Sequence, residues 1–133
     1  MAKDIYHETV KTALVAAGWQ ITDDPLRVAI SRRLAYIDLG AKNVLTASRD
    51  GREIAVEIKS FVGASLLDDM YGAVGQYTLY RPALARRIDV PPLYLALSTV
   101  AWKLIREEQL NTFFDELSVR LLIFNPANQQ IEQ

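Results

Sequence analysis

Two carboxylates and an ammonium group have the types and the spacing that phosphodiester hydrolysis requires. Asp38 lies inside the extended stretch 34–39, where aspartate is unfavourable, and Glu57 and Lys59 lie two residues apart on a predicted strand, so both project from one face. Carboxylates from two neighbouring strands can hold Mg²⁺ or Mn²⁺, which polarises a phosphoryl group, while the ammonium stabilises the developing negative charge. The alternative interpretation is a solvated strand face that carries an ordinary Glu–Lys pair.

The separation of these groups depends on the hairpin that joins their strands. The Asp-Gly pair at 50–51 is the strongest hairpin signal in the chain, and a two-residue turn there would place Asp38 opposite Gly63. That position is too far along the strand for direct contact between the two carboxylates. A bulge at 40–43, where the strand pattern breaks, would move Asp38 towards Lys59.

Hydrophobic periodicity predicts one α/β domain, residues 1–133, built on a central mixed sheet with flanking helices. Pro82 is expected to end the second helix, because proline cannot donate a backbone hydrogen bond. The segment 125–130 has a loose, polar composition. The predicted helices are 4–17, 67–80 and 100–117, and the predicted strands are 19–21, 26–30, 34–39, 44–48, 53–61, 93–97 and 119–124.

Composition excludes several classes of site. The 133 residues are 50% hydrophobic and include no cysteine and one histidine, which excludes disulfide frameworks, zinc ribbons and thiol nucleophiles. The 15 basic and 16 acidic residues give a net charge of -1, which excludes a uniformly basic surface but leaves room for a local basic groove. Because the chain has no apolar signal segment and no apolar run of bilayer length, we expect a cytoplasmic protein without membrane association.

Asp38 followed by Glu57-Ile58-Lys59, within this order of helices and strands, resembles the PD-(D/E)xK nuclease superfamily. The resemblance implies a restriction-endonuclease-like fold, although the proline that names the superfamily is absent before Asp38. Glu8, on the first predicted helix, matches an extra metal-directed carboxylate of some members, and Gln76-x-x-x-Tyr80 resembles an element of RecB-type nucleases. The implied catalytic residues are Asp38, Glu57, Lys59, Glu8 and Gln76, and the implied ligands of Mg²⁺ or Mn²⁺ are Asp38, Glu57 and Glu8.

A closer resemblance extends over nearly the whole chain. Segments of this sequence are similar to the XisH family, the fdxN element excision controlling factors of cyanobacteria, at 1–7, 17–19, 36–41, 54–61, 75–77 and 93–96. The resemblance implies a part in the programmed excision of a DNA element by a site-specific recombinase, together with the companion protein XisI. Two functions remain open: a metal-dependent nuclease that acts on DNA, and a non-catalytic accessory subunit that binds XisI or the recombinase. The nearly neutral net charge favours the second.

Contacts with DNA are expected from polar and basic residues near the second predicted helix and just after the predicted strand 26–30. Gln76 and Tyr80 lie four residues apart, so both would project from one helix face. Clustered arginines offer phosphate contacts, with an ordinary solvated surface as the alternative. A protein partner could dock on an exposed Phe113-Phe114 step, and a homodimer is expected by analogy with DNA-processing proteins of this fold. The arginines are Arg32, Arg33 and Arg81, with Arg86 and Arg87 as further candidates.

Overall fold

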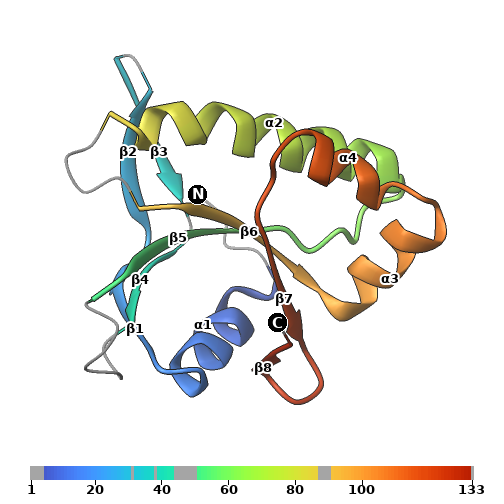
Figure 1. Ribbon diagram of the computed structural model, residues 1–133, viewed down its shortest axis with the longest axis horizontal. Coiled ribbons are helices and arrows are strands. Elements are labelled where there is room, and N and C mark those ends of the chain that lie inside the picture. The colour runs from blue at the N-terminus through green and yellow to red at the C-terminus, as the bar shows by residue number, and fades with distance from the viewer. Residues whose placement is uncertain (1–4, 31, 38, 44–50, 87–90, 133) are drawn as a thin grey trace.

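The chain folds into a six-stranded mixed sheet with helices on both faces, accompanied by a separate two-stranded ribbon (Figure 1). This computed structural model describes residues 5–30, 32–37, 39–43, 51–86 and 91–132, with only the backbone described for 34–37 and 39–43. The helices are α1 (His7–Ala16), α2 (Leu66–Leu84), α3 (Thr99–Glu107) and α4 (Asn111–Glu116). The strands are β1 (Trp19–Asp23), β2 (Leu26–Ile30), β3 (Arg33–Ile37), β4 (Leu39–Asn43), β5 (Glu53–Ile58), β6 (Leu93–Ser98), β7 (Leu121–Asn125) and β8 (Gln130–Ile131).

The connections between strands determine the topology of the large sheet. Its order is β1-β4-β5-β6-β7-β8, in which β5, β6 and β7 run parallel and the other neighbouring pairs are antiparallel. Parallel neighbours need long crossovers, and α2 connects β5 to β6 whereas α3 and α4 connect β6 to β7. This architecture confirms the predicted mixed sheet with flanking helices.

β5 is buried on both of its faces because a hydrophobic core lies on each side of the sheet. On one side, Val56 and Ile58 pack with Val10 and Leu14 of α1. On the other side, Ala55 belongs to the larger core beneath α2 and α3. The alternation of a strand therefore decides which core each β5 side chain enters.

The predicted strand 34–39 is confirmed for 34–37, but it does not continue as one strand, because the stretch is divided between two sheets. β3 ends at Ile37 and pairs with β2 in the ribbon, whereas β4 begins at Leu39 and pairs with β1 and β5. The predicted break at 40–43 is also wrong, since these residues are strand. Their glycine and asparagine have low strand propensity, but hydrogen bonding to strands on both sides outweighs it. The predicted strand 44–48 lies outside the described residues.

The register expected for the β4–β5 hairpin is not observed. Leu39 lies opposite Val56 and Lys42 lies opposite Glu53, whereas a two-residue turn at 50–51 would place Leu39 opposite Val62. The connection between β4 and β5 is therefore longer than a tight turn. An Asp-Gly pair favours a turn, but the pairing of the flanking strands decides which residues face each other.

Two of the predicted helices end in different places. α2 continues through Pro82, because Leu84 beyond it is buried in the core and this packing offsets the hydrogen bond that proline cannot donate. The predicted helix 100–117 is divided into α3 and α4, with Gln109 between them at a φ of 59°. A residue in this left-handed conformation cannot continue a right-handed helix. None of the described helices is both long enough and apolar enough to cross a membrane.

The C-terminal segment 125–130 is ordered by its own side chains rather than loose. The Oδ1 atom of Asn125 accepts a hydrogen bond from the backbone of Ala127 at 2.9 Å, and Oδ1 of Asn128 accepts one from the backbone of Gln130 at 3.1 Å. Such asparagine turns reverse the chain within a few residues. The reversal brings β8 back along β7 at the edge of the sheet.

Candidate functional site

Glu57 lies inside the sheet. It belongs to β5, which is flanked by β4 and β6, and only 6% of the residue is exposed. By strand alternation it shares a face with Ala55, which packs in the core beneath α2, and with Lys59 just beyond the end of the strand. A carboxylate is retained in such a place where hydrogen bonds, a cation or a metal offset its lost hydration.

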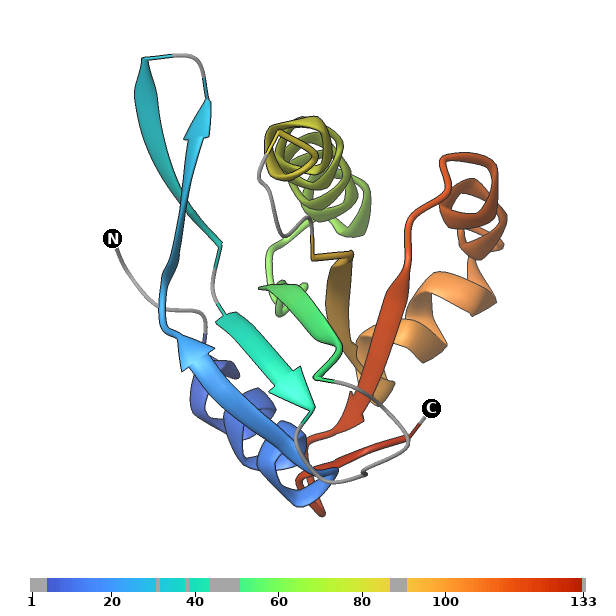
Figure 2. The same ribbon diagram turned by 60° about the vertical axis from the view of Figure 1, so that its left-hand side comes forward.

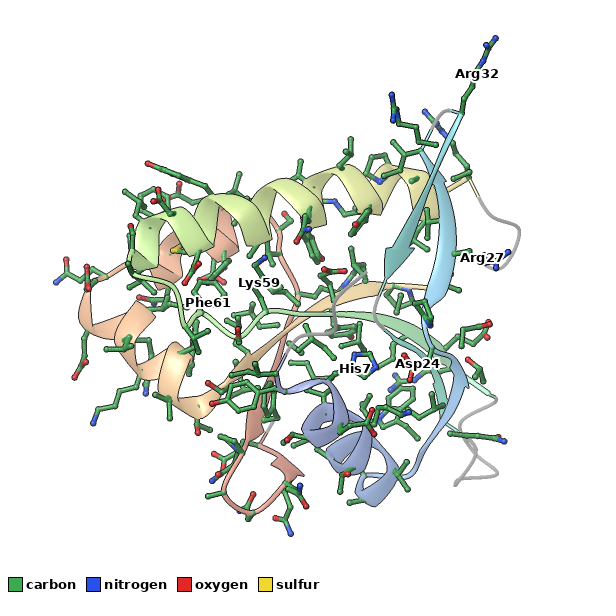
Figure 3. All side chains as sticks on the ribbon, turned by 180° about the vertical axis from the view of Figure 1, so that it is seen from behind. His7, Asp24, Arg27, Arg32, Lys59 and Phe61 are labelled. Atoms are coloured by element: carbon green, nitrogen blue, oxygen red, sulfur yellow. The ribbon has the colours of Figure 1, made fainter. Side chains whose placement is uncertain are left out.

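Lys59 extends from the end of β5 towards α2 (Figure 3). Its backbone N–H donates to the carbonyl oxygen of Ala96 at 3.2 Å, which continues the pairing with β6. Its side chain passes Gly72, where an added Cβ would lie 3.8 Å from Nζ and 3.9 Å from Cε of Lys59. Gln76 lies one helical turn beyond Gly72 and is exposed, whereas Tyr80 is 8% exposed and packs in the core. The helix therefore presents Gln76, rather than Tyr80, to solvent.

Asp38 lies outside the described residues, so its neighbour along the chain provides the structural evidence. Leu39, the first residue of β4, lies opposite Val56, which directly precedes Glu57 in β5. β4 and β5 run side by side in Figures 1 and 2. β4, which begins one residue after Asp38 in the sequence, is therefore the direct neighbour of β5, which carries Glu57.

Glu8 lies in a second group of titratable residues, formed by α1 and the turn between β1 and β2. Ligand atoms of His7, Glu8 and Asp24 all lie within 4.8 Å of one another. The Nζ atom of Lys11 is 2.9 Å from Oδ2 of Asp24 and 3.9 Å from Oε2 of Glu8, so an ammonium already supplies positive charge there. A metal ion would have to compete with Lys11 for this group. The role of Glu8 beside the strand carboxylates stays a prediction.

The Asp24 cluster, which we define as His7, Lys11 and Asp24, joins α1 to the β1–β2 turn. His7 is 3% exposed, and its Nε2 atom lies 2.7 Å from Oδ1 of Asp24. Burial alone would raise the pKa of Asp24. The hydrogen bonds with Lys11 and His7 together outweigh burial, so the pKa lies below its ordinary value of 3.8. The hydrogen bond to Asp24 raises the pKa of Lys11 against a smaller opposing effect of burial. The sequence pattern indicates only a turn at 23–25. Local spacing does not reveal that Asp24 contacts His7, which lies 17 residues earlier in the chain.

Arg81 is engaged by the protein itself. Its Nη1 atom donates to the carbonyl oxygens of Ser118 at 2.9 Å and Leu117 at 3.3 Å. The guanidinium carbon lies 5.4 Å from the centre of the Tyr77 ring. These contacts attach α2 to the connection between α4 and β7.

Two of the other predicted arginines belong to the β2–β3 ribbon. Arg32 and Arg33 are exposed at its tip, where β2 turns into β3. Arg86 is exposed just after the end of α2, and Arg87 lies outside the described residues. Arg32 and Arg33 are thus carried by the ribbon, whereas Arg81 belongs to α2 and contacts the connection between α4 and β7.

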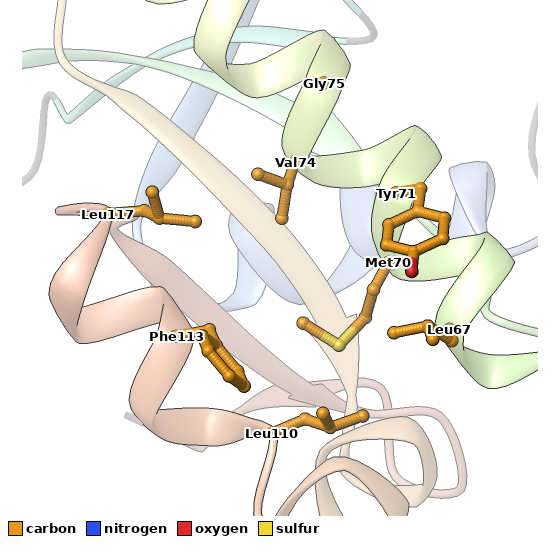
Figure 4. Close-up of a pocket in the computed structure, with 8 residues that line it drawn as sticks. All are labelled: Leu67, Met70, Tyr71, Val74, Gly75, Leu110, Phe113 and Leu117. Carbon is orange, nitrogen blue, oxygen red and sulfur yellow. The ribbon is translucent and has the colours of Figure 1, made fainter.

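An apolar groove with a volume of about 510 Å³ lies between α2 and α4 (Figure 4). Its walls include Leu67 and Tyr71 from α2 and Phe113 from α4, whose exposed fractions are 46%, 64% and 48%. Phe114, by contrast, is 1% exposed and belongs to the core. Only the first phenylalanine of the predicted docking step is therefore available to a partner.

Comparisons with known proteins cover the chain from end to end. Residues 1–132 match the family model described as XisH protein. Two crystal structures, of an XisH family protein from Nostoc punctiforme and of an fdxN element excision controlling factor protein from Anabaena variabilis, are each 34% identical in sequence with a TM-score of 0.86. Each similarity covers 98% of this chain and 98% of the other. No curated protein is matched. The predicted resemblance to the XisH family is thus confirmed, and the chain belongs to that family.

Proposed function

We propose that this chain is a metal-dependent nuclease of the restriction-endonuclease-like type, which acts on DNA during the excision of an fdxN-type element. The observation that carries the proposal is the burial of Glu57 in β5, two residues before Lys59 and beside the strand that follows Asp38. A buried carboxylate and a half-buried lysine both lose hydration, which a purely structural strand has little reason to tolerate. The Anabaena variabilis protein is described as an fdxN element excision controlling factor, which supports an action on DNA.

The proposed donor set suits a hard divalent cation. Asp38 and Glu57 offer carboxylate oxygens, the ligands that Mg²⁺ and Mn²⁺ prefer, and Glu8 is a further candidate from α1. When bound, the metal would polarise the phosphoryl group and activate water. Lys59 would stabilise the negative charge that develops on the phosphate. Gln76, exposed on α2, would orient the DNA strand that is cut.

The experiment that tests this proposal compares cleavage of supercoiled, branched and linear DNA by wild type, Glu57→Gln and Glu53→Gln in Mg²⁺ or Mn²⁺. Glu53 is the matched control because it is a half-buried glutamate at the start of the same strand. We expect Glu57→Gln to lose at least about 100-fold in cleavage rate and to weaken Mn²⁺ binding in calorimetry. Glu53→Gln should change neither quantity. Equal cleavage by wild type and Glu57→Gln, or no cleavage of any DNA by wild type, would refute the proposal.

The apolar groove favours a second candidate function, that of an accessory subunit that binds the companion protein XisI. The groove is lined by uncharged residues, whereas Asp68 and Glu116 are exposed next to its wall residues Leu67 and Leu117 along the chain. An amphipathic helix of the companion would bury its apolar face between α2 and α4 and place basic residues near these carboxylates.

Calorimetry of the chain with XisI tests this second function. Phe113→Ser removes an apolar wall of the groove, and Val100→Ser is the matched control because Val100 is 60% exposed on α3 outside the groove wall. We expect Phe113→Ser to weaken binding by about tenfold or more, with Val100→Ser unchanged. Glu57→Gln should bind XisI as wild type does, so the two functions are tested separately. Equal binding by Phe113→Ser and wild type, or no binding by wild type, would contradict it.

A further inference from the structure

The β2–β3 ribbon stands apart from the six-stranded sheet. Its two strands pair antiparallel from Leu26 opposite Ile37 to Ile30 opposite Arg33, and Figure 2 shows them projecting beyond the sheet as a narrow arm. Figure 3 shows Arg32 at the tip, pointing away from the rest of the molecule. The ribbon therefore offers a thin, two-stranded element to a partner.

The base of this arm is anchored in the core, and its arginines are exposed. Leu26 and Val28 are 5% and 2% exposed and pack in the core beneath α2. Arg27 lies between them in the strand and is exposed on the opposite face, and Figure 3 shows it pointing outward near the base of the ribbon. Arg32 and Arg33 are exposed at the tip. Packing thus holds the arm in place while its arginines face solvent.

The charge of the ribbon differs from that of the rest of the chain. Residues 26–37 contain three arginines and no acidic residue, whereas the chain as a whole has a net charge of -1. The remainder must therefore carry a net charge of about -4, the difference between these two values. A polyanion would therefore be attracted more strongly to the ribbon than to the remainder of the chain.

The dimensions of the ribbon suit the major groove of duplex DNA. Two paired strands lie about 4.8 Å apart, and the major groove of B-form DNA is about 12 Å wide and about 8.5 Å deep, which admits a two-stranded ribbon. Arg27 lies about 14 Å along the strand from the tip, at about 3.4 Å per residue. When the tip reaches the base edges, the backbone of Arg27 lies about 5 Å outside the groove, which is about 8.5 Å deep, and a long arginine side chain spans that distance to the phosphates.

We propose that the β2–β3 ribbon inserts into the major groove of duplex DNA, with Arg32 and Arg33 directed to the groove and Arg27 to the phosphate backbone. The inference rests on the proposed action on DNA but is independent of cleavage. It assigns duplex recognition to an arm separate from Glu57 and Lys59. The chemistry is charge-assisted hydrogen bonding from guanidinium groups to base edges and phosphates.

The test is fluorescence anisotropy of labelled duplex DNA in metal-free buffer across a range of salt concentrations. Arg32→Ala/Arg33→Ala is compared with Lys103→Ala/Arg106→Ala, which removes the same charge from the exposed face of α3. Each lost phosphate contact reduces the slope of log K against log salt concentration by about 0.9. Relative to 1 M salt, this amounts to about an eightfold loss of affinity at 0.1 M salt. The ribbon variant should therefore bind about 60-fold more weakly, and the control should bind more tightly than the ribbon variant by at least tenfold. Circular dichroism verifies that each variant is folded.

A second measurement identifies the groove, because guanine N7 faces the major groove. We expect the wild type, but not the ribbon variant, to protect guanine N7 from methylation. Equal affinity of the ribbon and control variants, unprotected N7, or equally tight binding of duplex RNA, whose major groove is too narrow, would overturn the inference. Cleavage without ribbon-dependent binding would overturn it and leave the proposed nuclease intact.

Discussion

Replacement of Asp24 by alanine is expected to destabilise the protein strongly, although Asp24 lies in a turn. Its two carboxylate oxygens meet His7 at 2.7 Å and Lys11 at 2.9 Å. Truncation of Asp24 to alanine would remove the carboxylate that pairs with the Nε2 atom of His7. The side chain of His7 is only 4% exposed, so water cannot readily replace that carboxylate. His7 Nδ1 is also buried and makes no hydrogen bond within the described part of the chain, so the ring depends on Asp24.

The magnitude follows from the burial of each partner. A hydrogen bond between buried His7 and a charged carboxylate contributes about 1.5–3 kcal/mol, and the more exposed pair with Lys11 contributes at most about 1 kcal/mol. Asp24→Ala should therefore lower the free energy of unfolding by about 2–4 kcal/mol. With an unfolding entropy of about 0.28 kcal/mol/K for a chain of this length, Tm should fall by about 7–14 °C.

The assay is urea unfolding at several pH values for wild type, Asp24→Ala, Asp24→Asn and Asp23→Ala. Because the folded-state pKa of Asp24 lies below 3.8, its charge stabilises the protein above that pH. This contribution is lost as the pH falls through the lowered folded-state pKa. The raised pKa of Lys11 acts oppositely, since its contribution is lost only as the pH rises above 10.5. Asp24→Asn, which keeps an oxygen acceptor, should fall between alanine and wild type.

Asp23 provides the control for this experiment, because it is an exposed neighbour in the same turn region. Asp23→Ala should change the free energy of unfolding by less than about 0.5 kcal/mol. The reasoning is refuted if Asp24→Ala costs no more than this control at pH 7. It is equally refuted if the difference from wild type persists unchanged well below pH 3.8.

Three further predictions concern the core, α2 and the proposed metal site. Tyr77 is 0% exposed, and its hydroxyl donates to Leu93 O at 2.9 Å and accepts from Arg120 N at 3.1 Å. Tyr77→Phe should therefore cost about 1–3 kcal/mol in urea unfolding, and a cost below about 0.5 kcal/mol would contradict this role. Gly75→Ala should raise the free energy of unfolding by about 1 kcal/mol and Tm by about 3–4 °C, since an added Cβ meets nothing within 4 Å; a lower Tm would show a hidden clash. Mn²⁺ at 100 times its Kd should stabilise wild type by about 2.7 kcal/mol, and an equal gain for Glu57→Gln would place the metal elsewhere.

Local patterns predicted the elements that lie within one stretch of chain. Apolar residues at helical spacing indicated α1, and Gly18 behind it has a φ of 95°, as expected of a glycine that follows a helix. Alternation correctly predicted β2, in which Leu26 and Val28 are buried and Arg27 is exposed. The same alternation placed Glu57 and Lys59 on one face, and the structure has Ala55, on that face, in the core beneath α2.

Local patterns did not predict the features that depend on contacts between distant parts of the chain. A tight turn at 50–51 predicted the wrong partner for Leu39, because hydrogen bonding to both β1 and β5 selects the register. The extended stretch 34–39 contains no local signal that its two ends join different sheets. Pro82 predicted a helix end that core packing of Leu84 overrides. Each error concerns a residue whose contacts lie far away in the sequence.

The sequence by itself determined the XisH family resemblance, the helices and strands with strong periodicity, and the common face of Glu57 and Lys59. Only the tertiary structure decided that Leu39 meets Val56, that α2 passes over the side chain of Lys59 at Gly72, and that the β2–β3 ribbon stands apart. The physical reason is the range of the interactions involved. Side-chain periodicity is set by the local backbone, whereas register, burial and charge pairing depend on groups that only folding brings together.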